Sequence, residues 1–285
     1  MTAGSGIRAV QDFWENNPLF EGESAWPEGT KEFFSEHRDV VIKDFFAGHI
    51  PDYLFPAVPE REAVLDLGCG PGFWTAEFLL GKRADSIVSC DLTSKALELT
   101  AKRLAYLDLP ARMVQGNAES LPFRENSFAF VNCQGVIHHT PHPKKCIEEM
   151  FRITRPGGHV SVSVYYLNFF LRHWNLFRHL GSAAYRCGIG AKGRGRESLF
   201  TTEDPHELIR KYDGSGNPLG KGFTTKDFNH LIGNTGFDVK KVYYISAPTR
   251  ILPASLPGFV RRIYRRSLPY MIGALLEKPQ PAHEK

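Results

Sequence analysis

The stretch VLDLGCGPGFW, residues 64–74, joins a buried strand pattern to a helical pattern through a loop of small and rigid residues. The loop carries Gly68, Gly70 and Gly72, and Asp66 lies just before it. In open α/β sheets the ligand lies beyond the carboxyl ends of the strands, and glycines there let the backbone approach it closely. The stretch therefore predicts a ligand-binding loop after the first strand of such a sheet.

Two common phosphate-binding loops do not fit this stretch. A dinucleotide loop has the pattern G-x-G-x-x-G, and counting from Gly68 puts Phe73 where the third glycine lets helix and strand pack closely. A triphosphate loop ends in Gly-Lys-Ser/Thr, and residues 68–75 contain no lysine. The sequence therefore disfavours both a nicotinamide dinucleotide and a nucleoside triphosphate.

Outward from the loop, apolar strand-like runs alternate with helical runs. From Ala63 they read AVLDLG, FWTAEFLL, SIVSCD, SKALELTAKRLAYL and ARMVQGN, then SFAFVNCQGV, PKKCIEEMFRIT and GHVSVSVYY. The alternation resumes at TTKDFNHLIGNTGF, DVKKVYYIS and YMIGALLEKP. Apolar strands separated by helices are typical of a buried parallel sheet, and right-handed crossovers make the sheet doubly wound. The predicted fold class is therefore α/β with a doubly wound sheet.

Other segments precede or interrupt this alternation. Residues 1–60 show helical spacing of aromatic residues and no strand pattern, so we expect a helical N-terminal cap or lid. The main domain, 61–285, carries insertions at about 166–222 and 248–268. The aromatic residues of the first insertion either wall an apolar substrate pocket or pack into an enlarged core.

Composition narrows the class of protein. The chain has 285 residues and a formal net charge of +4, which does not by itself predict nucleic-acid binding. It has no signal-like apolar stretch at its start and no run of the roughly 18 apolar residues that a membrane span needs. No Cys/His cluster predicts a metal site. The cysteines are odd in number and lack C-x-x-C spacing, which favours a reduced, cytoplasmic protein; they are Cys69, Cys90, Cys133, Cys146 and Cys187.

The glycine loop has a close parallel in one enzyme class. Its D-x-G-x-G-x-G pattern, which begins at Asp66, resembles motif I of class I S-adenosylmethionine-dependent methyltransferases. Asp91 ends the second strand pattern, where a carboxylate can accept hydrogen bonds from both hydroxyls of a ribose. GNAESLPFRENSFAFV and FRITRPGGHVSVSV are similar to later strand regions of the ubiquinone/menaquinone methyltransferase-like branch. This resemblance implies a Rossmann-like seven-stranded sheet with an antiparallel last strand and S-adenosyl-L-methionine as cofactor.

The resemblance also implies a set of cofactor contacts. The backbone of Gly68 and Gly70 would lie against the methionine part, Asp91 would hold the ribose, and Asn117 would face the adenine. Many relatives have Asp where this chain has Asn117, so the adenine would meet a neutral acceptor. We expect Asp66 to orient the loop through hydrogen bonds and Arg38 to pair with the cofactor carboxylate. The full expected set is Arg38, Asp66, Gly68, Cys69, Gly70, Asp91, Leu92, Asn117, Ala118, Glu119, Cys133 and Gln134.

Catalytic and substrate residues follow the fourth and fifth strand patterns. Alignment of acceptor and methyl group is the main requirement of such a transfer, but a protonated acceptor also needs a base. His138 and His139 lie at the ligand end, and either of them could act as that base or simply cap the following loop. Tyr165 and Tyr166 either touch the substrate or pack at the end of the sheet.

Three functions are compatible with these features. The first is a methyltransferase acting on a small, apolar or aromatic molecule at O, N or C. The second is an RNA or protein methyltransferase, and the third is a non-catalytic cofactor-binding scaffold. We expect no DNA partner, and RNA is disfavoured because only residues 188–198 and the arginines at 261–266 are basic tracts. The 259–268 segment is either a solvated basic face or a contact with a membrane or lipid. The sequence gives no sign of an oligomeric state.

Overall fold

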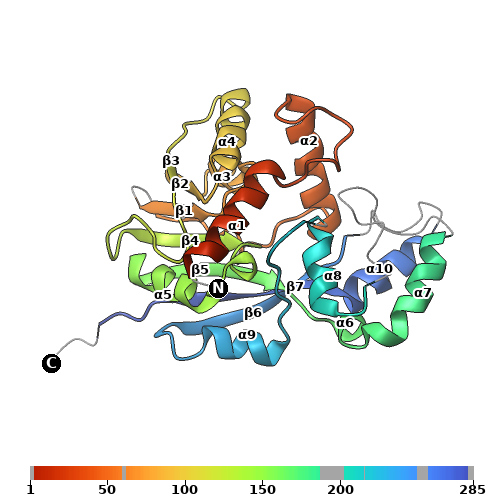
Figure 1. Ribbon diagram of the computed structural model, residues 1–285. Coiled ribbons are helices and arrows are strands. Elements are labelled where there is room, and N and C mark those ends of the chain that lie inside the picture. The colour runs from red at the N-terminus through yellow and green to blue at the C-terminus, as the bar shows by residue number, and fades with distance from the viewer. Residues whose placement is uncertain (1–2, 60–61, 187–201, 215, 249–255, 282–285) are drawn as a thin grey trace.

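The computed structural model describes residues 3–59, 62–186, 202–214, 216–248 and 256–281 (Figure 1). Seven strands form one sheet in the order β3-β2-β1-β4-β5-β7-β6. They are β1 Ala63–Leu67, β2 Ser86–Asp91, β3 Met113–Gln115, β4 Phe128–Gln134, β5 Thr154–Tyr165, β6 Asp238–Ser246 and β7 Pro269–Glu277. Strands β1 to β5 pair in parallel, whereas β7 is antiparallel to both β5 and β6. The predicted seven-stranded sheet with its antiparallel last strand is confirmed.

Helices cover both faces of the sheet (Figure 1). Val64 and Leu65 are neighbours in β1 and both are fully buried, but they belong to different apolar clusters. Successive side chains of a strand point to opposite faces, so both faces of the central strands are in the core. The helices are α1 Ala3–Asn16, α2 Lys31–Val40, α3 Phe73–Leu80, α4 Ser94–Tyr106, α5 Pro143–Ile153, α6 Phe169–Arg172, α7 Trp174–Arg186, α8 Pro205–Tyr212, α9 Thr225–Ile232 and α10 Gly258–Ser267, with shorter turns η1 Val41–Phe45 and η2 Ile137–His139.

The N-terminal segment forms helices that pack on the main domain. The carboxylate of Glu15, near the end of α1, accepts hydrogen bonds from the backbone N–H groups of Ser94 (2.9 Å) and Lys95 (3.0 Å) at the start of α4. An anion is stabilised at a helix N-terminus because unpaired N–H groups and the helix dipole are directed at it. This contact fixes one end of α1 beside the carboxyl end of β2.

The insertions after β5 and β6 are helical where the structure describes them. Helices α6, α7 and α8 follow β5, and α10 precedes β7. Figure 1 shows these four helices gathered at one end of the molecule, away from β3. The basic tract at 188–198, Cys187 and part of the second insertion lie outside the described residues. Within the described ranges, no helix is both long and apolar enough to cross a membrane.

Candidate functional site

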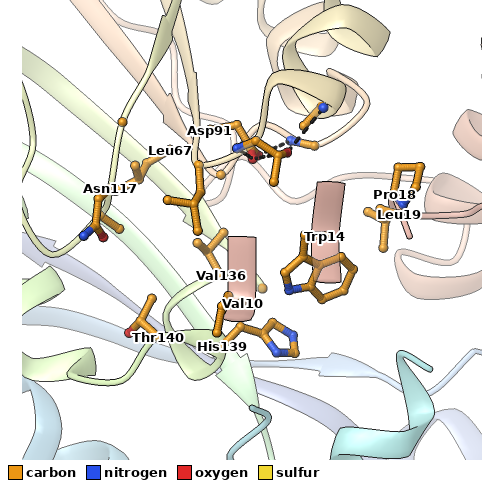
Figure 2. Close-up of a pocket in the computed structure, with 18 of the residues that line it drawn as sticks. Val10, Trp14, Pro18, Leu19, Leu67, Asp91, Asn117, Val136, His139 and Thr140 are labelled. Carbon is orange, nitrogen blue, oxygen red and sulfur yellow. Dashed lines mark hydrogen bonds between the residues drawn. The ribbon is translucent and has the colours of Figure 1, made fainter. Parts of the chain in front are cut away.

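A cavity of about 150 Å³ lies where the strand order reverses. Strand β1 has β2 on one side and β4 on the other, and the loops after all three strands face the cavity. Such a reversal point is where open α/β sheets bind their ligands. Helix α1 crosses the remaining side, as the cut cylinders of Figure 2 indicate. The cavity is lined by Ile7, Val10, Trp14, Pro18, Leu19, Leu67, Gly68, Gly70, Pro71, Asp91, Leu92, Thr93, Ala96, Leu99, Gly116, Asn117, Ala118, Gln134, Gly135, Val136, His139 and Thr140.

The glycine loop packs against the loop that follows β4. Gly68 has a φ of +71°, and a Cβ on it would lie 2.2 Å from Cγ2 of Val136, so no other residue fits. The N–H groups of Gly68 and Cys69 both donate to the carbonyl of Cys90, at 2.7 and 3.1 Å. At Gly70 a Cβ would meet only Leu19, at 3.8 Å, so the loop backbone borders open space there.

Asp66 is a buried anchor rather than a wall of the cavity. Its Oδ2 accepts hydrogen bonds from the Thr75 N–H (3.0 Å) and hydroxyl (2.7 Å), and its Oδ1 accepts from Asn132 (2.9 Å). Burial raises the pKa of this carboxyl to about 6. Asp66 thus fastens the start of α3 to β1 and β4 and orients the loop between them without touching the cavity.

Asp91 lies at the end of β2 and does line the cavity (Figure 2). Its Oδ2 accepts from the Gly70 N–H at 3.0 Å, and its Oδ1 accepts from the N–H (3.0 Å) and hydroxyl (2.9 Å) of Thr93. The pKa of Asp91 is raised above its ordinary value, because burial outweighs the opposite effect of these hydrogen bonds. The Asp91 carboxylate thus holds the glycine loop and borders the cavity at the same time.

The loop after β3 forms the far end of the cavity. Gly116, Asn117 and Ala118 line it, and Figure 2 shows Asn117 on the side away from Trp14. The Asn117 side chain accepts a hydrogen bond from the Glu119 N–H at 2.9 Å, which closes a tight turn. The Glu119 carboxylate is turned away, where it accepts from the His142 N–H at 2.6 Å.

Several residues expected at the cofactor do not line the cavity. Arg38 forms two hydrogen bonds with Glu77, at 2.5 and 3.0 Å, and so joins α2 to α3. Cys133 is fully buried in β4, and Cys69 is 5% exposed. Arg38, Asp66, Cys69, Glu119 and Cys133 therefore lie outside the set of residues that line this cavity.

Leu92 and Gln134 line the cavity, but their polar groups are engaged elsewhere. The Gln134 amide donates to the Ser161 hydroxyl at 2.9 Å, across the sheet. The Leu92 carbonyl accepts from the side chain of Gln11 at 3.0 Å, which adds a second link between α1 and the main domain.

Helix α1 supplies residues that the expected set lacked. Ile7, Val10 and Trp14 lie on one face of α1 toward the cavity, and Pro18 and Leu19 follow it. Their spacing of three and four residues is typical of the buried face of a helix. The sequence therefore indicates that these residues share a buried face. The spacing gives no indication of which part of the sheet that face covers.

The two adjacent histidines have different environments. His139 lines the cavity; its Nδ1 lies 2.8 Å from the Leu219 carbonyl and its Nε2 lies 3.4 Å from Oδ2 of Asp213. His138 is fully buried, neither ring nitrogen has a hydrogen-bond partner among the described residues, and burial lowers its pKa well below the usual value. Of the two histidines that the sequence offers as a base, His139 lines the cavity and His138 is buried away from it.

Tyr165 and Tyr166 line a second cavity, of about 310 Å³, in the insertion. The Tyr165 hydroxyl donates to Asp213 at 2.7 Å, and its ring centroid lies 5.8 Å from that of His139. His139, Asp213 and Tyr165 thus form the boundary between the two cavities. The second cavity is lined by Tyr165, Tyr166, Asn168, Phe170, Leu171, Trp174, Leu208, Ile209, Tyr212, Ala247, Pro248, Tyr264, Leu268 and Tyr270. Over the described ranges no group of three or more His, Cys, Asp or Glu is placed to hold a metal ion.

Comparison with known proteins assigns the central part of this site. Residues 65–162 match the family described as a methyltransferase domain. The ubiquinone/menaquinone biosynthesis C-methyltransferase UbiE of Pseudoalteromonas translucida is 36% identical over 103 residues, 35% of this chain and 41% of that protein. The chain spans no more than half the length of the first curated relatives it matches.

Solved structures extend the likeness of fold over most of the chain. A chain of the complex between the Haloferax volcanii Trm112 methyltransferase activator and a methyltransferase superposes with a TM-score of 0.57 at 17% identity, covering 87% of this chain and 92% of that one. The [4+2]-cyclase SpnF superposes with a TM-score of 0.53 at 14% identity, covering 98% and 95%. Residues 65–162 thus match a methyltransferase domain, and the chain shares a Rossmann-like fold with these solved structures.

Proposed function

Given a methyltransferase domain at residues 65–162, we propose that the whole protein is an S-adenosylmethionine-dependent methyltransferase that acts on a small apolar or aromatic molecule. The observation that carries the proposal is the arrangement of Asp91 and Gly70. One carboxylate both holds the glycine loop and faces the cavity at the strand-order reversal. No such carboxylate is needed in a site that only packs apolar side chains.

The residues around the first cavity fit this cofactor. The Asp91 carboxylate lines the cavity, where we expect it to accept from a ribose hydroxyl, and the backbone at Gly70 borders space for the methionine part. Asn117 and Ala118 are placed for the adenine, at the far end of the same cavity. When bound there, S-adenosylmethionine would supply the methyl group of its sulfonium to the acceptor. The sulfur that loses the methyl group would become a neutral thioether.

The second cavity supports a small apolar acceptor. Its walls are almost wholly aromatic and aliphatic, and burial raises the pKa of Tyr165 and Tyr270 well above the usual value, so both hydroxyls stay protonated. An apolar molecule gains about 25 cal/mol per Å² of surface removed from water in such a site. We therefore assign this cavity to the apolar part of the acceptor.

We assign His139 a positioning role at the boundary of the two cavities. Its Nδ1 faces a carbonyl and its Nε2 faces Asp213, so both nitrogens are directed at acceptors within the protein. The ring also packs against Trp14, with centroids 5.1 Å apart. In a transfer limited by alignment, such a fixed wall excludes water and directs the acceptor.

We place the protein in the cytoplasm, in keeping with the four described cysteines, which are free thiols.

The test is a transfer assay on the purified full chain. Protein is incubated with S-adenosylmethionine labelled in the methyl group and with separate sets of aromatic phenols, apolar amines, transfer RNA and a protein extract. Transfer to a small apolar acceptor is the expected result. Transfer only to RNA or protein would replace the acceptor class, and cofactor binding without transfer to any set would favour a non-catalytic scaffold.

A further inference from the structure

The helices of the insertions expose large apolar side chains to solvent. Among the described residues, the five most exposed large hydrophobics all lie on α6, α7 and α10. They are Leu176 (71% exposed), Leu180 (67%), Phe259 (65%), Ile263 (59%) and Phe169 (55%). Monomeric proteins rarely leave such a group uncovered, and clusters of exposed apolar residues mark interaction sites. We refer to these five residues as the outer apolar surface.

The apolar residues follow helical spacing on each helix. Leu176 and Leu180 are four residues apart on α7, and Phe259 and Ile263 are four apart on α10, so each pair lies on one face. On the opposite side of α10, Tyr264 faces the second cavity, as does Trp174 of α7. The helices therefore have an inner face that is already used and an outer face that is apolar and exposed.

The charge of these helices has a single sign. Helices α6, α7 and α10 contain no Asp or Glu, and their basic residues are Arg172, Arg178, His179, Arg186, Arg261, Arg262, Arg265 and Arg266. Arg172, Arg186 and Arg262 are exposed. Arg178 is paired with Glu203 at 2.7 Å, and Arg265 donates to the Lys43 carbonyl at 2.7 Å. The chain as a whole, by contrast, has charges of both signs, with 35 Lys and Arg and 31 Asp and Glu.

We propose that the outer apolar surface docks on an anionic lipid bilayer. Helices with exposed apolar residues and arginines beside them lie in the interfacial plane, where the apolar side chains enter the acyl boundary and the cations meet anionic headgroups. Docking brings the second cavity to the bilayer, because Phe170, which is 39% exposed, belongs both to α6 and to the cavity wall.

The experiment is vesicle flotation with the full chain and no cofactor, so its outcome is independent of methyl transfer. Vesicles of phosphatidylcholine mixed with phosphatidylglycerol are compared with vesicles of phosphatidylcholine alone, at low and high salt. We expect binding to the mixed vesicles that salt weakens. The double variant Phe259→Ser with Ile263→Ser should reduce it at least about tenfold, the effect of losing roughly 1.4 kcal/mol of apolar contact. Arg262→Gln should weaken binding to the anionic vesicles alone.

The matched control is Leu107→Ser with Met113→Ser, two apolar residues with exposures of 39% and 37% at the β3 edge. This variant should bind vesicles as the unchanged protein does. The proposal is overturned if the unchanged protein binds neither kind of vesicle. It is also overturned if the two double variants bind the mixed vesicles equally. It is also overturned if sedimentation shows a dimer that only the Phe259 and Ile263 double variant dissociates, since a second copy would then cover the surface.

Discussion

Asp66 and Asp91 lie at the carboxyl ends of the adjacent strands β1 and β2, yet only Asp91 lines the first cavity. Asp66 accepts three hydrogen bonds from Thr75 and Asn132 inside the protein and is 1% exposed. Asp91 accepts three as well, but from loop groups that border the cavity. Removing a buried acceptor leaves its donors unpaired, so changes at Asp66 act on folding and changes at Asp91 act on both binding and loop geometry.

Arg38 gives a clear prediction because its partner is inside the protein. Arg38→Gln removes the ion pair with Glu77, whose side chain is 8% exposed, and the free energy of unfolding in urea should fall by about 1 kcal/mol. The Arg38 side chain is itself 47% exposed, which limits the loss. Affinity for S-adenosylmethionine should stay within about twofold, since neither Arg38 nor Glu77 lines the first cavity.

The matched control for Arg38 is Arg83→Gln. Arg83 pairs at 2.9 Å with Asp52, whose side chain is 74% exposed, so a smaller loss of stability is expected. If Arg38→Gln instead abolished cofactor binding and left the unfolding free energy unchanged, the guanidinium would have to contact the cofactor carboxylate after all.

The burial of His138 predicts a pH effect on stability. Its pKa in the folded protein is lowered well below its ordinary value near 6.5, so the unfolded chain binds the proton more tightly. Stability from this residue is therefore fully present above pH 6.5 and is lost as the pH falls, by up to about 1.4 kcal/mol per pH unit. His138→Leu should remove that part of the slope, as unfolding in urea from pH 7 down to pH 5 would show. An unchanged slope would mean that His138 already takes up its proton in the folded state.

At the scale of elements, α1 forms one side of the first cavity. Ile7, Val10 and Trp14 form one side of it, and Glu15 and Gln11 tie the helix to the main domain. The cavity of about 150 Å³ is smaller than the several hundred Å³ usual for ligand sites. We therefore expect α1 to move outward when a ligand of that size enters.

This arrangement predicts a fluorescence signal from Trp14. Binding of S-adenosylmethionine should change the tryptophan emission, because Trp14 lines the cavity. Trp14→Phe should remove most of the change. Trp26→Phe should retain it, because Trp26 is 52% exposed and does not line this cavity. A change that persists in Trp14→Phe would place the shift in another element.

The strands and the glycine loop could be predicted from sequence because their signals are local. Apolar runs, turn residues and the spacing of Asp66, Gly68 and Gly70 are all contained in short stretches. The partner of Arg38 could not be predicted, since Glu77 is distant in sequence and only the packing of α2 on α3 brings the two together. The same holds for Asp213, which meets His139 and Tyr165 through the insertion.

At the scale of the whole molecule, two cavities share the carboxyl end of the sheet and have different chemistry. The first is bordered by a glycine loop and a carboxylate, and the second by aromatic side chains of the insertion. The family match covers residues 65–162, which include much of the first cavity and none of the residues that line the second. In the proposed function the acceptor is therefore held by residues outside the family match, in keeping with the rule that fold alone does not set function.

The most direct test of the central claim is titration calorimetry of S-adenosylmethionine and S-adenosylhomocysteine into the purified full chain. We predict one site for each ligand, with the affinity for both reduced at least about tenfold in Asp91→Asn, because a charge-assisted hydrogen bond is lost. Asp108→Asn, at an exposed turn, should bind as the unchanged protein does. If the folded protein binds neither ligand, or if Asp91→Asn binds them as tightly as the unchanged protein, the first cavity is not the cofactor site.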